Sequence, residues 1–348
     1  MRNPARENDW PLVTVIMPVR NEARFIARSL GAVLNQDYPP ERLQIIVVDG
    51  MSTDGTREKV ERLRRRGVDL CLIDNPGVIV PTGLNAALRL AKGEVIVRVD
   101  GHCEIAPDYV RRCVAHLESG EADGVGGPLE TVGTGIVAQA IARAMSSPFG
   151  VGGSAFRTVR DRALYVDTIA FPAYTRRIVE MAGPFDEELV RNQDDEYNYR
   201  LRKLGARLLL APDVRARYYS RSSFRSLWRQ YLQYGYWKVR VLQKHPAQMR
   251  WRQFVPPLFV FAIAVASILA PFDGGSSLMT LGLVYSASAI ACALYEGRSY
   301  PTLMPLVALA FATMHLAYGI GFWVGLIKFR RLWRPYDAEG SVHGSIRG

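Results

Sequence analysis

Short apolar runs alternate with amphipathic segments through the first hundred residues. The runs that predict buried strands are residues 12–18, 43–48, 68–73 and 94–99. Helical spacing of apolar residues follows the first three runs, at residues 20–34, 52–66 and 82–92. This alternation predicts right-handed βαβ units, so we expect an α/β domain with a Rossmann-like, mostly parallel sheet. We expect Pro18 to end the first strand, because proline cannot donate to the sheet ladder.

Three long apolar stretches occupy most of the last hundred residues. They are residues 254–272, 278–295 and 301–329. Each is about long enough to cross a hydrocarbon layer roughly 30 Å thick, and Pro256 and Pro257 predict a kink in the first. Basic residues lie before and after the three stretches, and both basic groups favour the cytosol. One stretch is therefore expected to be re-entrant or interfacial, and the sequence leaves open which one.

An aromatic and basic segment at residues 222–242 precedes these stretches. It predicts a helix in the lipid headgroup region, with aromatic side chains facing inward and cations facing outward. We therefore divide the chain into an α/β domain, an interfacial region, transmembrane helices and a tail. The corresponding boundaries are residues 1–221, 222–252, 253–334 and 335–348.

The distribution of charge points to a membrane surface. The chain holds 44 Lys and Arg against 33 Asp and Glu, and residues 214–253 contain ten basic residues and no acidic one. Because apolar stretches follow directly, an anionic membrane is favoured over nucleic acid, for which no recognition motif is present. The four cysteines form no CxxC pair, and residues 1–10 lack the apolar core of a signal peptide. We expect the α/β domain to lie in a reducing cytosol.

Acidic residues follow three of the predicted strands. Glu22, Asp49 and Asp100 come after the first, second and fourth strands, and His102 lies two residues beyond Asp100. Ligands bind beyond the carboxyl ends of parallel strands, so these side chains are expected to face one crevice. Asp100 and His102 could share a divalent ion, or could simply be a helix cap and a polar loop residue. No GxGxxG motif follows the first strand and no P-loop motif occurs. The sequence therefore supports neither a dinucleotide-binding fold nor a P-loop fold.

Four ordered motifs resemble those of family 2 glycosyltransferases. They are residues 18–22 (PVRNE), 47–56 (VVDGMSTDGT), 85–94 (Asn85 through AKGE) and 100–102 (DGH). The resemblance implies a GT-A fold, a nucleotide-activated sugar donor, inversion at the anomeric carbon, and Mg²⁺ or Mn²⁺ as cofactor.

The resemblance also implies roles for single residues. Those expected to hold the nucleotide sugar are Pro18, Arg20, Glu22, Asp49 and Asp100. Asp100 and His102 occupy the metal-binding motif, in which His102 replaces the usual second aspartate. Gly50 stands where a second acidic residue is common, and Leu84 replaces a frequent arginine.

The acidic run at residues 193–200 contains the candidate catalytic base. In an arbitrary protein such a run could simply complement a helix macrodipole. Inverting glycosyl transfer needs a carboxylate that takes the proton of the acceptor hydroxyl. Alignment on Arg200 with the family motif implies Asp194 as this base, with Gln193 in place of a glutamate; Asp195 is the alternative.

These features together predict a multi-pass protein of the bacterial inner membrane with a cytosolic glycosyltransferase domain. Residues 95–102 and 191–196 most resemble the branch of the family that acts in succinoglycan biosynthesis. That implies hexosyl transfer, from UDP-glucose or another UDP-sugar, to a polyprenyl-diphosphate-linked saccharide in exopolysaccharide synthesis. The alternatives are transfer to polyprenyl phosphate itself, or a non-catalytic membrane scaffold that only binds nucleotide.

Overall fold

The computed structural model describes residues 10–64, 67–298 and 300–333. Its first four strands match the four predicted runs and lie parallel to one another. They are β1 (Val13–Val19), β2 (Leu43–Asp49), β3 (Asp69–Asp74) and β4 (Val95–Arg98). Pro18 lies within β1 opposite Val48, so the expectation that it ends the strand is wrong. The pairing of β1 with β4 stops at Ile16, and a missing N–H is tolerated where a neighbouring strand has ended.

Four further strands extend the sheet, in the order β3-β2-β1-β4-β9-β6-β10-β8. The added strands are β9 (Ala173–Thr175), β6 (Gly124–Gly126), β10 (Leu208–Leu210) and β8 (Leu164–Tyr165). β9 runs antiparallel between β4 and β6, which makes the sheet mixed. A separate three-stranded sheet contains β5 (Cys103–Ile105), β11 (Ala216–Tyr219) and β7 (Leu129–Val132).

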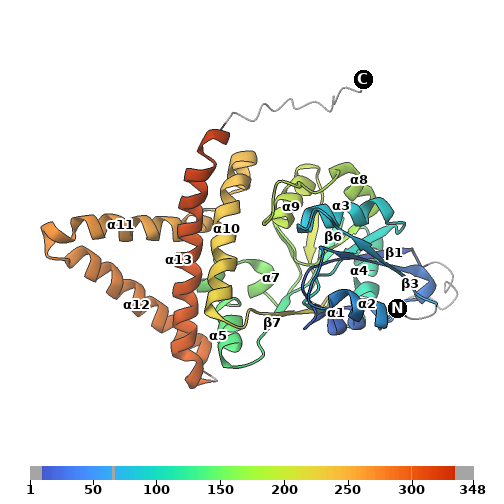
Figure 1. The fold of residues 1–348 in the computed structure, drawn as a ribbon, viewed down its shortest axis with the longest axis horizontal. Coiled ribbons are helices and arrows are strands. Elements are labelled where there is room, and N and C mark those ends of the chain that lie inside the picture. Colours follow the sequence, from blue (N-terminus) through green and yellow to red (C-terminus); the bar gives the residue numbers. More distant parts are fainter. Residues whose placement is uncertain (1–9, 65–66, 299, 334–348) are drawn as a thin grey trace.

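Helices cover both faces of the large sheet (Figure 1). On one face lie α1 (Ile26–Leu34), α2 (Thr56–Arg62) and α4 (Tyr109–Glu118), whose apolar residues pack with those of β1 and β2. On the other face lie α3 (Val80–Leu90), α8 (Arg176–Ala182) and α9 (Gln193–Lys203). Val15 and Ile16 of β1 enter opposite cores, as the two-residue repeat of a strand requires.

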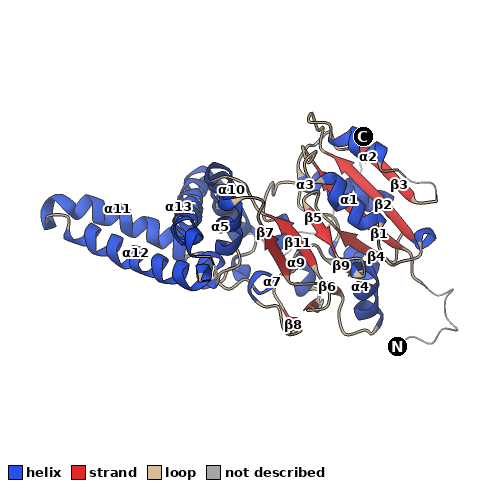
Figure 2. Cartoon of the chain, turned by 90° about the horizontal axis from the view of Figure 1, so that it is seen from below, coloured by secondary structure: helices blue, strands red, loops and turns tan. Residues whose placement is uncertain are grey.

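A long amphipathic helix joins the α/β domain to the apolar helices. α10 (Phe224–Lys244) lies beside α13 (Met304–Lys328) in both views (Figures 1 and 2). A Cβ atom at Gly235 would lie 2.0 Å from the carbonyl oxygen of Tyr318, and one at Gly321 would lie 2.1 Å from that of Leu232. Such a close approach of a neighbouring backbone needs a residue without a side chain on one of the two helices, and the glycine supplies it at each contact. α10 is therefore tightly packed against α13.

The cations of α10 do not all face outward as expected. Lys238 and Arg240 are buried, and their partners are Asp195 and Glu188 of the α/β domain. The expected orientation is wrong for these two residues, because carboxylates of the α/β domain cover that side of the helix. Arg229 is exposed, as predicted.

Two apolar helices form a hairpin that projects away from the rest of the molecule (Figures 1 and 2). They are α11 (Val255–Asp273) and α12 (Ser276–Gly297), joined at Gly274 and Gly275. The predicted kink at Pro256 and Pro257 is absent, because both lie in the first turn of α11, where the backbone N–H groups have no helical partner. In the described part of the chain, α11, α12 and residues 301–328 are long and apolar enough to cross a membrane.

Three short helices connect these parts. They are α5 (Ile136–Ala144), α6 (Pro148–Val151) and α7 (Ala155–Thr158). Phe149 of α6 packs edge-on against Phe311 of α13, at a ring separation of 5.0 Å. The α/β domain and the apolar helices thus share one continuous core, which includes residues of α5 and α13.

Candidate active site

A single cavity of about 1200 Å³ connects the carboxyl ends of β1 and β4 with the apolar helices. Asp100, His102 and Asp194 all line it. Asp194 is far from the other two in the sequence, and the fold brings all three to one cavity. Pro18, Arg20 and Glu22 line it too. The far end is formed by side chains of α11, α12 and α13, among them Phe259, Leu281 and Met314.

The loops after β1 and β2 are held together by side-chain hydrogen bonds. The backbone N–H groups of Asn21 and Glu22 donate to the hydroxyls of Ser52 and Thr56, both at 2.8 Å. Asn21 has a left-handed backbone with φ 53°, and these bonds hold it there. The STDGT part of the second motif therefore shapes the wall of the cavity that carries Arg20 and Glu22.

Asp49 does not line this cavity. Its side chain is fully buried, and Oδ2 accepts hydrogen bonds from Arg57 Nη1 and the Ser52 backbone N–H, both at 3.0 Å. A Cβ atom at neighbouring Gly50 would lie 2.9 Å from the carbonyl oxygen of Val78, so a larger side chain there would displace the loop. A direct contact between Asp49 and the donor stays a prediction.

Asp100 and His102 are oriented by neighbouring side chains. Arg98 Nε and Nη2 donate to the two oxygens of Asp100, at 3.0 and 3.3 Å. His102 Nδ1 lies 2.9 Å from Glu22 Oε1. In the neutral imidazole that donates to this carboxylate, Nε2 is the nitrogen that could bind a metal. About a fifth of each side chain is exposed, 22% for Asp100 and 16% for His102.

This donor set fits a divalent metal. A carboxylate with spare lone pairs and an imidazole oriented by a second carboxylate are both good ligands for Mn²⁺ or Mg²⁺. In residues 10–64, 67–298 and 300–333 no group of three or more His, Cys, Asp or Glu side chains could hold a metal ion. Asp100 and His102 would therefore hold the metal together with oxygens of a bound diphosphate.

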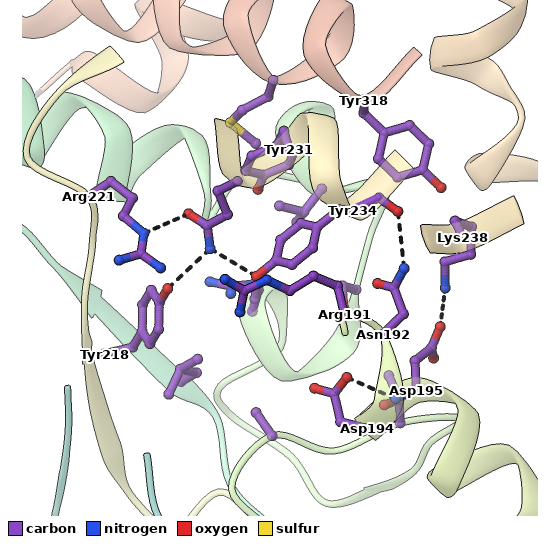
Figure 3. Close-up of a pocket in the computed structure, with 18 of the residues that line it drawn as sticks. Arg191, Asn192, Asp194, Asp195, Tyr218, Arg221, Tyr231, Tyr234, Lys238 and Tyr318 are labelled. Atoms are coloured by element: carbon purple, nitrogen blue, oxygen red, sulfur yellow. Dashed lines mark hydrogen bonds and ion pairs between the residues drawn. The ribbon is translucent and has the colours of Figure 1, made fainter. Parts of the chain in front are cut away.

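The two candidate bases have different surroundings (Figure 3). Asp195 pairs with the buried Lys238. Among the described residues, Asp194 Oδ1 accepts a hydrogen bond from the backbone N–H of Asp195 alone, at 2.9 Å. Burial lowers the pKa of Arg98, but the nearby carboxylates of Asp100 and Asp194 outweigh burial and raise it. Asp194 thus lies in the electrostatic surroundings of Asp100, and Asp195 is engaged in holding α9 to α10.

Two other residues of the predicted motifs have structural contacts. Asn85 Nδ2 donates to the carbonyl oxygen of Phe185 at 2.9 Å and its Oδ1 accepts the Phe185 N–H at 2.8 Å. Burial raises the pKa of Glu196, but hydrogen bonds from His245 and Arg200 outweigh burial and lower it. Neither Asn85 nor Glu196 lines the cavity. They fix the segments that precede and follow Asp194.

Sequence reasoning missed several polar residues of the cavity. Arg157, Arg191, Arg221 and Gln230 all line it. Arg221 and Gln230 lie in the basic region assigned to the membrane surface, and no local pattern separates them from its exposed cations. The sequence does carry a signal for Arg98, because a charged residue inside an apolar strand needs a buried partner.

An ion-pair cluster between the α/β domain and α10 predicts a pH-dependent stability. Hydrogen bonds from Arg240 lower the pKa of Glu188 to about 2. The ion pair of Glu188 with Arg240 stabilises the fold fully when the pH is above roughly 4.3, the pKa of an unfolded glutamate. This contribution is lost as the pH falls towards 2. Thermal unfolding in detergent should show Glu188→Gln to be less stable than the wild type at pH 7, by about 0.2–1 kcal/mol for a partly exposed pair. The two proteins should converge near pH 2; a constant difference from pH 7 to 2 would contradict the prediction.

The family of the chain follows from comparison with known proteins. The family model described as Glycosyl transferase family 2 matches residues 14–179. The succinoglycan biosynthesis protein ExoA of Rhizobium meliloti (strain 1021) is 32% identical over 328 residues, which cover 91% of this chain and 96% of that protein. The chain belongs to glycosyltransferase family 2. Asp100 and His102 lie inside the matched segment, and Asp194 lies beyond it.

A second relative of this glycosyltransferase matches it in sequence, and two solved structures share its fold. A Methanococcus voltae protein, dolichyl N-acetyl-alpha-D-glucosaminyl phosphate 3-beta-D-2,3-diacetamido-2,3-dideoxy-beta-D-glucuronosyltransferase, is 25% identical and covers 91% of this chain and 97% of its own length. The mannosyltransferase PcManGT from Pyrobaculum calidifontis, solved with GDP-Man and Mn²⁺, has a TM-score of 0.58 at 22% identity over 88% of this chain and 87% of its own. S. aureus TarS 1–349 with UDP-GlcNAc has a TM-score of 0.53 at 19% identity, covering 93% of both chains. The predicted GT-A architecture is confirmed.

Proposed function

We propose that this glycosyltransferase moves glucose from UDP-glucose, with inversion, to a polyprenyl-diphosphate-linked saccharide during synthesis of a cell-surface polysaccharide. The main support is that one cavity contains Asp100, His102 and Asp194 and continues to the apolar helices α11–α13. A lipid-linked acceptor needs such continuity, because its saccharide must reach the base while its lipid stays in an apolar environment. The name of the ExoA relative supports a role in an exopolysaccharide.

The chemistry follows from the placement of Asp194. Its carboxylate accepts the proton of an acceptor hydroxyl as that oxygen bonds to the anomeric carbon, and the bond from this carbon to the diphosphate breaks on the opposite face. This displacement inverts the anomeric centre. Asp100 and His102 Nε2 would hold Mg²⁺ or Mn²⁺, whose charge stabilises the departing diphosphate when the ion is bound. Pro18, Arg20 and Glu22 form the wall against which the donor would bind.

The membrane topology is the second part of the proposal: α11 and α12 cross the bacterial inner membrane, and α13 lies at its cytosolic surface. α11 has 19 residues and, at about 1.5 Å per residue, spans about 29 Å, close to the thickness of the hydrocarbon layer. α13 runs across the base of this hairpin and not along it (Figures 1 and 2). A basic residue flanks each end of the hairpin: Arg252 lies before α11 and Arg298 after α12. Segments next to membrane helices are enriched in Lys and Arg on the cytosolic side.

This topology predicts which positions an external reagent can reach. In intact cells, a membrane-impermeant maleimide should label Gly274→Cys at the tip of the hairpin, and Arg331→Cys only after permeabilisation. The unsubstituted protein provides the background from its four native cysteines. Labelling of Arg331→Cys in intact cells would show three crossings and contradict the interfacial position of α13.

A product assay tests the proposed reaction. The full chain in proteoliposomes would receive a panel of nucleotide sugars with Mn²⁺, and either a polyprenyl-diphosphate saccharide or polyprenyl phosphate as acceptor. Mass spectrometry should show one added hexose on the diphosphate-linked saccharide with UDP-glucose as donor. A single sugar on polyprenyl phosphate would support the alternative enzyme. Absence of every product, with UDP still bound, would support the non-catalytic scaffold.

A further inference from the structure

Five arginines that line the cavity have no carboxylate partner in the described part of the chain. Arg20 and Arg24 belong to the wall proposed for the donor, and the other three lie elsewhere in the cavity. They are Arg157 of α7, Arg191 before α9 and Arg221 before α10. Each is half-buried, and each makes a side-chain hydrogen bond to a neutral oxygen. A guanidinium has five N–H donors, so most of their donors are left for a ligand.

Neutral side chains hold these arginines in place. Arg221 Nε donates to Gln230 Oε1 at 3.3 Å (Figure 3). Arg191 Nε donates to Gln233 Oε1 at 3.1 Å. Arg157 lies over the ring of Tyr218, with its Cζ 5.4 Å from the ring centre. The arginines are therefore positioned without being neutralised.

Tyr218 and Gln230 connect Arg157 and Arg221 into one site, and Arg191 lines the same cavity. Gln230 is buried, and its Nε2 donates to the hydroxyls of Tyr218 and Tyr234, at 3.3 and 2.8 Å. Burial raises the pKa of Tyr218, while the charges of Arg221 and Arg157 lower it in part, so both guanidiniums lie close to this ring. Other arginines, such as Arg98 and Arg200 of the α/β domain and Arg240 of α10, are paired with carboxylates. The unpaired cluster thus favours an anion of several charges.

We propose that Arg157, Arg191 and Arg221 bind the diphosphate of the lipid-linked acceptor. This inference rests on the proposed function. The donor diphosphate is expected at Asp100 and His102. Arg157 and Arg221 come from the segments that join the α/β domain to the apolar helices, and Arg191 lies just before α9, which carries Asp194. Tyr231 and Tyr318, which line the same cavity, lead from the arginines towards α13 (Figure 3). A diphosphate bound here would leave its lipid against Met314 and Phe259 and its saccharide towards Asp194.

Binding of short analogues tests this site without turnover. Isothermal titration of the full chain in detergent would compare farnesyl diphosphate, farnesyl monophosphate, farnesol and inorganic pyrophosphate. Farnesyl diphosphate should bind most tightly. A charge-assisted hydrogen bond is worth about 1.5–3 kcal/mol, so Arg157→Gln, Arg191→Gln and Arg221→Gln should each weaken it by roughly 10- to 100-fold.

Arg229→Gln is the matched control, because it removes the same charge from an exposed position of α10 outside the cavity. It should leave farnesyl diphosphate binding unchanged. All four variants should bind UDP with Mn²⁺ like the wild type.

Three outcomes would overturn the assignment: unchanged farnesyl diphosphate affinity in the cavity variants, an equal loss of UDP affinity, or pyrophosphate binding as tight as that of farnesyl diphosphate. If the product assay shows no transfer but farnesyl diphosphate binding still depends on the arginines, the proposed function is contradicted and the diphosphate site is not.

Discussion

Replacing Asp194 by asparagine should lower glycosyl transfer by about 10²- to 10⁴-fold, the usual contribution of a general base. Asparagine has nearly the same shape but cannot accept the proton of the acceptor hydroxyl. Asp194 Oδ1 accepts a hydrogen bond from the Asp195 N–H, and the asparagine oxygen can still accept it. Donor binding should therefore be unchanged. Transfer is measured with radiolabelled UDP-glucose, and donor binding by titration with UDP and Mn²⁺.

Asp195→Asn provides the contrast to this variant. Asp195 pairs with the buried Lys238, so its loss should lower the temperature of unfolding and leave measurable transfer. The reverse pattern, with turnover retained in Asp194→Asn and abolished in a folded Asp195→Asn, would assign the base to Asp195.

Replacing His102 by alanine should remove most of the metal-dependent binding of UDP. The geometry leaves Nε2 of His102 free while Glu22 holds Nδ1, and Asp100 is the only other expected protein ligand. Loss of an outer-shell partner of a metal ligand commonly costs about 10- to 100-fold in affinity, so loss of a ligand itself should cost at least as much. The measurement is calorimetric titration with UDP, with and without Mn²⁺.

His116→Ala is a matched control for this experiment. His116 pairs with Glu121 and Asp213 outside the cavity, so its loss should leave UDP binding unchanged. Asp100→Asn should weaken binding in the same way as His102→Ala, while keeping a hydrogen-bonding partner for the buried Arg98. Metal-dependent affinity equal to the wild type in both site variants would remove Asp100 and His102 from the metal site.

Much of the α/β domain could be predicted, because strand and helix periodicities are local properties of the chain. The runs before Asp49 and Asp100 are apolar because their strands are buried on both faces, and parallel strands place their ends at one edge. The positions of Asp100 and His102 at the cavity follow from that rule. The same rule predicted that Asp49 faces the cavity, but Asp49 does not line it. Arg57 and Ser52 hold the Asp49 carboxylate inside the domain, and the position of a residue at a strand end does not reveal such contacts.

The interface between the α/β domain and the apolar helices could not be predicted in this way. The sequence of α10 shows an amphipathic helix with basic residues, which is equally typical of a helix on a lipid surface. Whether Lys238 faces water or a carboxylate depends on Asp195, which lies 43 residues away. The contact of Gly235 with Tyr318 depends likewise on a helix much later in the chain.

By itself, the amino-acid sequence determined the parallel α/β core, the acidic residues at its strand ends, the apolar helices and the resemblance to family 2 glycosyltransferases. These depend on residue type and on spacing within one segment. Only the tertiary structure decided that Asp194 shares a cavity with Asp100 and His102 and that Asp195 is paired with Lys238. It likewise decided that Arg157, Arg191 and Arg221 have no carboxylate partner in the part of the chain that is described. The physical reason is that pairing of charges and access to a cavity depend on which distant segments pack together.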